Sequence, residues 1–156
     1  MTDVVEVRLV GLPLEVHREA LEHSDEVRRE FAHLAEGTDP SHVPARLLAL
    51  HRDLSARYAP FTAATGNQVA EAMARGDSTM DVVYRVPTDA AGAARQLTDL
   101  WEEVDRYCEA GQYLLALRTP PRVLAYRSWF VEQFISQSAG ADPVDWPTWS
   151  ARSDNR

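Results

Sequence analysis

The chain carries one pattern of apolar runs, prolines and glycines twice, and this repetition limits the folds that it can adopt. Two apolar-rich runs end in a proline, Pro13 and Pro87. A long helical pattern follows each run and stops at a glycine, Gly37 in the first copy and Gly111 in the second. Both pairs are offset by about 74 residues, and a constant offset is typical of a duplicated unit. The sequence therefore predicts two similar halves.

The periodicity within each half predicts its elements. Apolar and polar residues alternate along 4–12 and 80–86, as in half-buried strands, and then recur at helical spacing. We expect an α+β fold, mostly helical, in which two βαα-like repeats, 4–76 and 80–140, build a single domain over 1–140. Their strands are expected to pair as a small two-stranded antiparallel sheet packed against helices, because a ribbon of two strands is unstable alone.

Three details of this fold are predicted separately. Pro60 should break or kink the helical pattern between residues 44–58 and 61–75, because proline has no backbone N–H. Residues 141–156 have no apolar period and are expected to be an extended Pro/Trp tail that docks on its own domain. The residues expected in the core are Val27, Phe31, Leu47, Leu54, Val82, Tyr84, Leu97, Trp101, Val104 and Phe130.

Charge and composition exclude several classes of function. The formal net charge is −8, which argues against nucleic acid as a partner because phosphate binding needs clustered basic side chains. All 16 basic residues are arginines, so mechanisms that need a lysine are excluded. Cys108 is the one cysteine, and it cannot form an internal disulfide. No apolar run is long enough for a membrane span and no leader opens the chain, so we expect a cytoplasmic protein that binds no membrane.

The histidines give no clear metal or catalytic motif. His17 and His23 are six residues apart and face different sides of a helix, and no His-Glu-x-x-His motif occurs. We therefore expect no metal site. His23 precedes acidic, aliphatic and arginine residues, as does the phosphoacceptor histidine of sensor kinases, but the spacing differs and the proline that ends that motif is missing. We expect a solvated His23 that carries no phosphate and tolerates substitution by alanine.

Other catalytic arrangements are also missing. Glu102, Glu103 and Asp105 are explained by a solvated helix face, and Cys108 falls on an apolar stripe where a small core residue is expected. No serine lies in a Gly-x-Ser-x-Gly motif. We therefore assign no catalytic residue and no cofactor.

Tryptophans are the candidate interaction residues. Trp129 lies in an aromatic cluster that covers more than one face of its predicted helix, and Trp146 and Trp149 lie in the tail. Large aromatic side chains are common anchors of protein interfaces. One face of this cluster and the tail are therefore candidate partner surfaces.

Nearly the whole chain resembles a family of small actinobacterial proteins of unknown function. The matching positions are Val7-Arg8-Leu9, Gly11, Pro13, Glu22-His23, Asp25-Glu26, Arg29-Glu30-Phe31, Pro44 to Leu48, Arg57-Tyr58, Phe61-Thr62, Val83-Tyr84, Val86-Pro87, Tyr107-Cys108, Pro120-Pro121, Arg127 to Phe134 and Trp146. The resemblance implies a genomic neighbourhood of STAS-domain anti-anti-sigma factors, anti-sigma ATPases and PP2C-type phosphatases. It implies no catalytic residue.

Two functions from different classes follow as predictions. The first is a non-enzymatic regulatory protein that acts by protein–protein contact, in a partner-switching system for stress signalling. The second is a small-molecule sensor or enzyme with a pocket between the two halves, since pockets favour such seams. A weaker alternative is phosphotransfer through His23. A deep cleft with convergent polar groups would favour the second function and a flat apolar patch the first, and a homo-oligomer is compatible with either.

Overall fold

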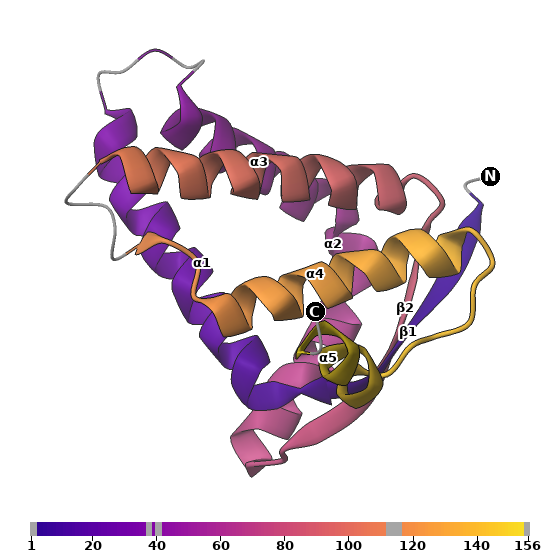
Figure 1. Cartoon of the computed structure of the whole chain (residues 1–156). Coiled ribbons are helices and arrows are strands. Elements are labelled where there is room, and N and C mark those ends of the chain that lie inside the picture. The colour runs from indigo at the N-terminus through magenta and orange to yellow at the C-terminus, as the bar shows by residue number, and fades with distance from the viewer. Residues whose placement is uncertain (1–2, 37–38, 40–41, 112–116, 155–156) are drawn as a thin grey trace.

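A computed structural model describes residues 3–36, 39, 42–111 and 117–154. Two strands and five helices follow one another in the order β1 (Val4–Pro13), α1 (Leu14–Ala35), α2 (Val43–Arg75), β2 (Thr79–Pro87), α3 (Ala90–Ala110), α4 (Pro121–Ser138) and α5 (Trp146–Asp154). Figure 1 shows the strands at one end of the molecule, with α3 and α4 extending from them toward α1. Gly37, the predicted end of the first helical pattern, lies outside the described residues.

The two strands form the predicted antiparallel sheet. Val7 pairs with Tyr84 and Leu9 with Val82, so these buried side chains share one face of the sheet and anchor the core. The register shifts between Leu9 and Leu12, where Gly11 adopts a φ of 69°. Such a left-handed conformation favours glycine, and the resulting bulge bends β1 at this point.

Helices cover both free edges of the sheet. Gln137 of α4 accepts a hydrogen bond from the backbone N–H of Arg8 and donates one to its carbonyl, each 2.8 Å long, so its amide replaces a neighbouring strand. On the other edge, the hydroxyl of Thr65 in α2 donates to the carbonyl of Val83 at 3.0 Å. Arg8 and Val83 face each other in the register. Both edges are therefore blocked at the same level against pairing with another chain.

The predicted break at Pro60 is absent, whereas a kink there, the other outcome that the sequence allowed, stays a prediction. α2 runs as one helix from Val43 to Arg75 with Pro60 inside it. Close by, the hydroxyl of Thr62 donates to the carbonyl of Tyr58 at 3.1 Å. Packing overrides the local cost of the proline, because the first part of α2 buries Leu47 and the last part buries Val69 against the sheet.

Two groups of buried side chains make up the core. One lies between the sheet, α4 and the end of α2, and the other lies where α1, α2 and α3 meet. Most of the predicted core residues are buried, namely Val27, Phe31, Leu47, Val82, Tyr84 and Val104. Leu54, Leu97, Trp101 and Phe130 are instead only half-buried. Three of these four exceptions line a cleft, which explains their exposure.

The C-terminal segment is helical where an extended tail was expected. Residues 146–154 form α5, which packs on β1 and α4. The ring of Trp146 lies 5.6 Å from that of Trp129, and Pro147 lies against Gly11. The prediction that this segment docks on its own domain is confirmed. Its helical form escaped prediction because a nine-residue helix is too short to show an apolar period.

The predicted α+β class is confirmed, and the element order is β-α-α, β-α-α and α5. That the halves are copies, and that the domain ends at residue 140, stay predictions. Among the described helices, none is both long and apolar enough to cross a bilayer.

Candidate functional site

A cleft of about 330 Å³ lies between α1, α3 and α4, and His51 of α2 also lines it. In the terms of the predicted repeat, its walls come from both halves. Apolar side chains make up most of its surface, and the exposed Leu21 and Leu124 lie among them. Its volume is at the lower end of the range of ligand pockets, about 300–1,000 Å³.

Three aromatic or aliphatic side chains owe their partial exposure to this cleft. Leu97 and Trp101 lie one helical turn apart on α3, and Phe130 contributes from α4. They fall on the apolar stripes of their helices, so a core position was expected. The helices instead stay far enough apart to leave the space between these side chains open.

Arg127 of α4 is the main polar group of the cleft. Its Nη2 lies 2.9 Å from the hydroxyl of Ser24, 3.0 Å from Nδ1 of His23 and 3.3 Å from the carbonyl of Ala20. Its guanidinium also lies 4.2 Å from the centre of the Trp101 ring, a cation–π contact. Burial lowers the pKa of Arg127 to about 10, so this side chain remains a cation at neutral pH.

His23 is buried, and the prediction of a solvated histidine is wrong. Its Nε2 lies 2.7 Å from the carbonyl of Leu117, which can only accept, so Nε2 carries the proton. Nδ1 then accepts from Arg127. Burial, together with the charge of Arg127, lowers the pKa of His23, although the Leu117 carbonyl opposes this shift. Both ring nitrogens are engaged, which disfavours His23 as a phosphoacceptor and gives it a role in holding Arg127.

Asp105 and Thr119 form a second polar element beside Arg127. One oxygen of the Asp105 carboxylate accepts from both the backbone N–H and the hydroxyl of Thr119, at 3.0 Å and 2.7 Å. The Thr119 hydroxyl in turn accepts a long, 3.4 Å hydrogen bond from Nη1 of Arg127. Asp105 therefore reaches the guanidinium through Thr119 and makes no direct ion pair with it at 4.0 Å or less.

Two further histidines line the cleft in their neutral form. Nδ1 of His17 lies 2.6 Å from the hydroxyl of Tyr126, and burial lowers the pKa of His17. Burial also lowers the pKa of His51, and the charge of Arg28 adds to this shift. The cleft thus combines apolar walls with the cation of Arg127, the carboxylates of Glu102 and Asp105, and two neutral imidazoles.

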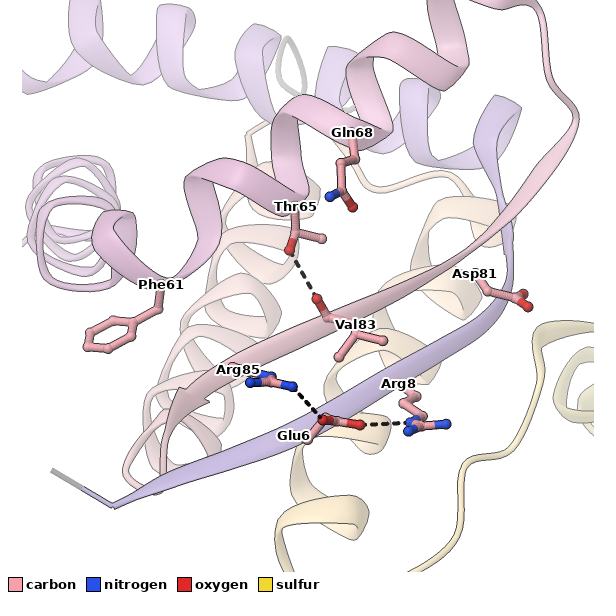
Figure 2. A pocket seen from close by; sticks show the side chains of 8 residues that line it. All are labelled: Glu6, Arg8, Phe61, Thr65, Gln68, Asp81, Val83 and Arg85. Atoms are coloured by element: carbon pink, nitrogen blue, oxygen red, sulfur yellow. Dashed lines mark hydrogen bonds and ion pairs between the residues drawn. The ribbon is translucent and has the colours of Figure 1, made fainter.

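A second hollow, of about 500 Å³, lies on the outer face of the sheet beside α2. Figure 2 shows Glu6 placed between the side chains of Arg8 and Arg85, at 2.8 Å and 3.6 Å. Asp81 accepts from the backbone N–H of Gly11, and Phe61 comes from α2. The charges here pair with one another and are exposed, so this hollow lacks the desolvated cation that distinguishes the cleft.

The three candidate interaction tryptophans occupy different environments. Trp129 is fully buried and its Nε1 donates to the carbonyl of Val144, so it is a core residue that cannot reach a partner directly. Trp146 and Trp149 are half-buried and stack on each other at 5.8 Å. Nε1 of Trp149 donates to Glu132. Of the three tryptophans, Trp146 and Trp149 on α5 are therefore the ones with surface that a partner could contact.

The prediction for Cys108 agrees with the structure. Cys108 is buried and burial raises its pKa to about 11, as expected of a core thiol. The side chains of the described residues bring together no cluster of histidine, cysteine, aspartate and glutamate suited to a metal ion.

Sequence reasoning missed Arg127. The available signal was an arginine between Val123 and Val131 on the apolar stripe of a predicted helix, four residues from each. A charged residue at such a position is expected to be paired or functional. A comparison of the chain with models of protein families, with curated proteins and with solved structures finds no match.

Proposed function

We propose that the protein is a small-molecule sensor with a regulatory role, and that its ligand binds in the cleft between α1, α3 and α4. One observation carries the proposal: apolar walls and convergent polar groups enclose about 330 Å³ at the seam of the two predicted halves. Largely apolar pockets with a few placed polar groups are the usual form of ligand sites. The second function that the sequence predicted was a small-molecule sensor or enzyme with a pocket between the halves, and the proposal takes the sensor of these two.

The chemistry of the cleft supports binding over catalysis. Ser24 is engaged by Arg127, and Cys108 is not among the lining residues. His17 and Tyr126 contact each other, so that neither ring orients a serine or cysteine nucleophile among the described residues. Nucleophilic catalysis needs such a base beside its nucleophile.

A neutral-ligand screen tests the proposal. We expect a set of small apolar molecules to shift the methyl NMR signals of Leu97, Leu124 and Val131, which all line the cleft. Thr98→Trp, which fills the cleft with an indole, should abolish these shifts. Gln68→Trp is the matched control because it places the same indole in the hollow beside the sheet. Shifts that are absent in the wild-type protein, or that persist in Thr98→Trp, would refute a ligand site in the cleft.

Regulation by protein–protein contact is the second candidate. Phe61 and Val83 lie together in the hollow on the sheet, and both are exposed, at 37% and 43%. The family resemblance points to a partner-switching system as the context. A pull-down from native cytoplasm tests this candidate, with the wild-type protein and the double variant Phe61→Ser/Val83→Ser as baits. The candidate requires that the wild-type protein captures a specific partner and that the double variant does not.

A further inference from the structure

We infer that Arg127 binds the carboxylate of the ligand, so that the cleft takes a monocarboxylate with an apolar body of about ten non-hydrogen atoms. The inference rests on the proposed function and specifies its ligand class. It follows from the unused hydrogen-bond donors of the Arg127 guanidinium, from the apolar walls around it and from the volume of the cleft.

Arg127 has donors to spare. A guanidinium has five N–H donors, and Nη2 is satisfied by Ser24 and His23. Nη1 has one long hydrogen bond to Thr119, and Nε has no hydrogen bond to any described residue. Because Nη2 takes part in both parallel forks of a guanidinium and is already engaged, a carboxylate oxygen would accept from Nε or from Nη1 alone, in a charge-assisted hydrogen bond that is stronger than one to a neutral acceptor.

Arg127 also lacks a direct counter-ion. Ion pairs elsewhere on the described chain are at the surface, as between Arg46 and Glu103, where both side chains are at least a third exposed. Arg127 makes no ion pair with a described carboxylate; burial lowers its pKa to about 10, and the charge of Asp105, which lies beyond Thr119, offsets only part of this shift. A partly buried cation without a direct ion pair is costly to a fold. The structure retains that cost at the wall of a cleft, where a bound anion would remove it.

The acidic residues of the cleft do not fill this role. Asp105 accepts two hydrogen bonds from Thr119, and its charge favours the Arg127 cation from beyond Thr119 without forming an ion pair with it. Glu102 lies in the cleft lining but is exposed to solvent. Charge at the cleft is nevertheless mixed, and an amine ligand bound by these two carboxylates is the alternative that the experiment must separate.

The remaining walls define the body of the ligand. Leu97, Trp101 and Phe130 offer apolar surface and aromatic edges around Arg127. At about 30 Å³ for each water-sized group, a cleft of about 330 Å³ holds roughly ten non-hydrogen atoms. An eight-carbon carboxylate has this size, so octanoate is a suitable probe.

Three probes of equal length separate the possibilities without any substitution. Octanoate, octan-1-ol and octylammonium are titrated into the wild-type protein, and binding is followed by calorimetry and by the methyl signals of Leu97 and Val131. We expect octanoate to bind at least tenfold more tightly than octanol, and octylammonium most weakly. Equal binding of octanoate and octanol at the cleft refutes the carboxylate inference while the proposed function stands. Tightest binding of octylammonium assigns the cleft to amines and also refutes it.

Two variants locate the effect. Arg127→Gln should reduce octanoate affinity to that of octanol, with its fold checked by near-UV circular dichroism. Arg85→Gln is the control, because Arg85 pairs with Glu6 in the hollow on the sheet and should leave octanoate binding unchanged. If Arg127→Gln does not fold, the three-probe comparison still decides. If none of the three probes binds but the neutral molecules shift the methyl signals of the cleft, the carboxylate inference is refuted and the proposed function stands. If neither experiment detects binding, both are refuted.

Discussion

Replacing Gln137 by methionine tests the edge protection of the sheet. Methionine matches the length of glutamine but cannot bond the backbone of Arg8, which then loses partners for both its N–H and its carbonyl. The hydrogen bond from Gln137 to Gln133 is lost as well. A buried group left without a partner costs about 1–3 kcal/mol. Because Arg8 is near solvent, the lower end of this range applies to each of its two groups. With the lost bond to Gln133, we expect the free energy of unfolding to fall by about 2–4 kcal/mol.

Urea denaturation followed by circular dichroism gives the free energy of unfolding, and hydrogen exchange reports the Arg8 amide directly. We expect that amide to exchange much faster in Gln137→Met, and the melting temperature to fall by about 5–15 °C at 2–4 °C per kcal/mol. Thr65→Val is the matched change on the opposite edge. It removes a single hydrogen bond to Val83 and should cost about 1 kcal/mol. An unfolding free energy within about 0.5 kcal/mol of wild type, with Arg8 still protected, would refute the reasoning.

The free energy of unfolding should fall as the pH drops below 6.5, because burial lowers the folded-state pKa of His17 and His23 and the unfolded chain then binds more protons than the folded one. In His17→Gln, the dependence of this free energy on pH, measured by urea denaturation from pH 8 to 5, should be shallower by at most about 1.4 kcal/mol per pH unit. Deleting residues 141–156 should lower the melting temperature by about 10 °C, since Trp146 and Trp149 leave the core; an unchanged temperature contradicts their docking. Pro60→Ala should raise the free energy of unfolding by about 1 kcal/mol in the same urea assay, because Pro60 is exposed and costs α2 a backbone hydrogen bond; an unchanged or lower value contradicts this reasoning.

Local pattern was sufficient for much of the fold. Alternation along the strands placed Val7 and Tyr84 on one buried face, and helical spacing placed Val27 and Phe31 in the core. These predictions hold because each depends on residues close together in the chain. Antiparallel pairing was also predicted, from the symmetry expected of a repeat.

The candidate site depends on contacts that no local pattern contains. His23 has the sequence neighbours of a solvated residue, yet Leu117 and Arg127, about 100 positions away, bury it. The burial of Gln137 was likewise not predictable from its neighbours in the sequence. A polar residue on a helix is expected to face water, and only the position of β1 shows that Gln137 bonds a strand edge. The openness of the cleft was equally hidden, since Leu97 and Trp101 follow the same spacing as true core residues.

The sheet also has a consequence for how the chain is made. β1 leaves the ribosome before the other described elements. Its one partner among the described strands, β2, follows about 70 residues later, which at about 5–20 residues per second takes roughly 4–15 s. Until then Val7 and Leu9 lack their partner strand, and of the described elements only α1 and α2 have been made and can shield them. Gln137 is synthesised later still, so the edge of β1 is covered last. Nascent chains that end before β2 is complete should therefore be the form most prone to aggregation.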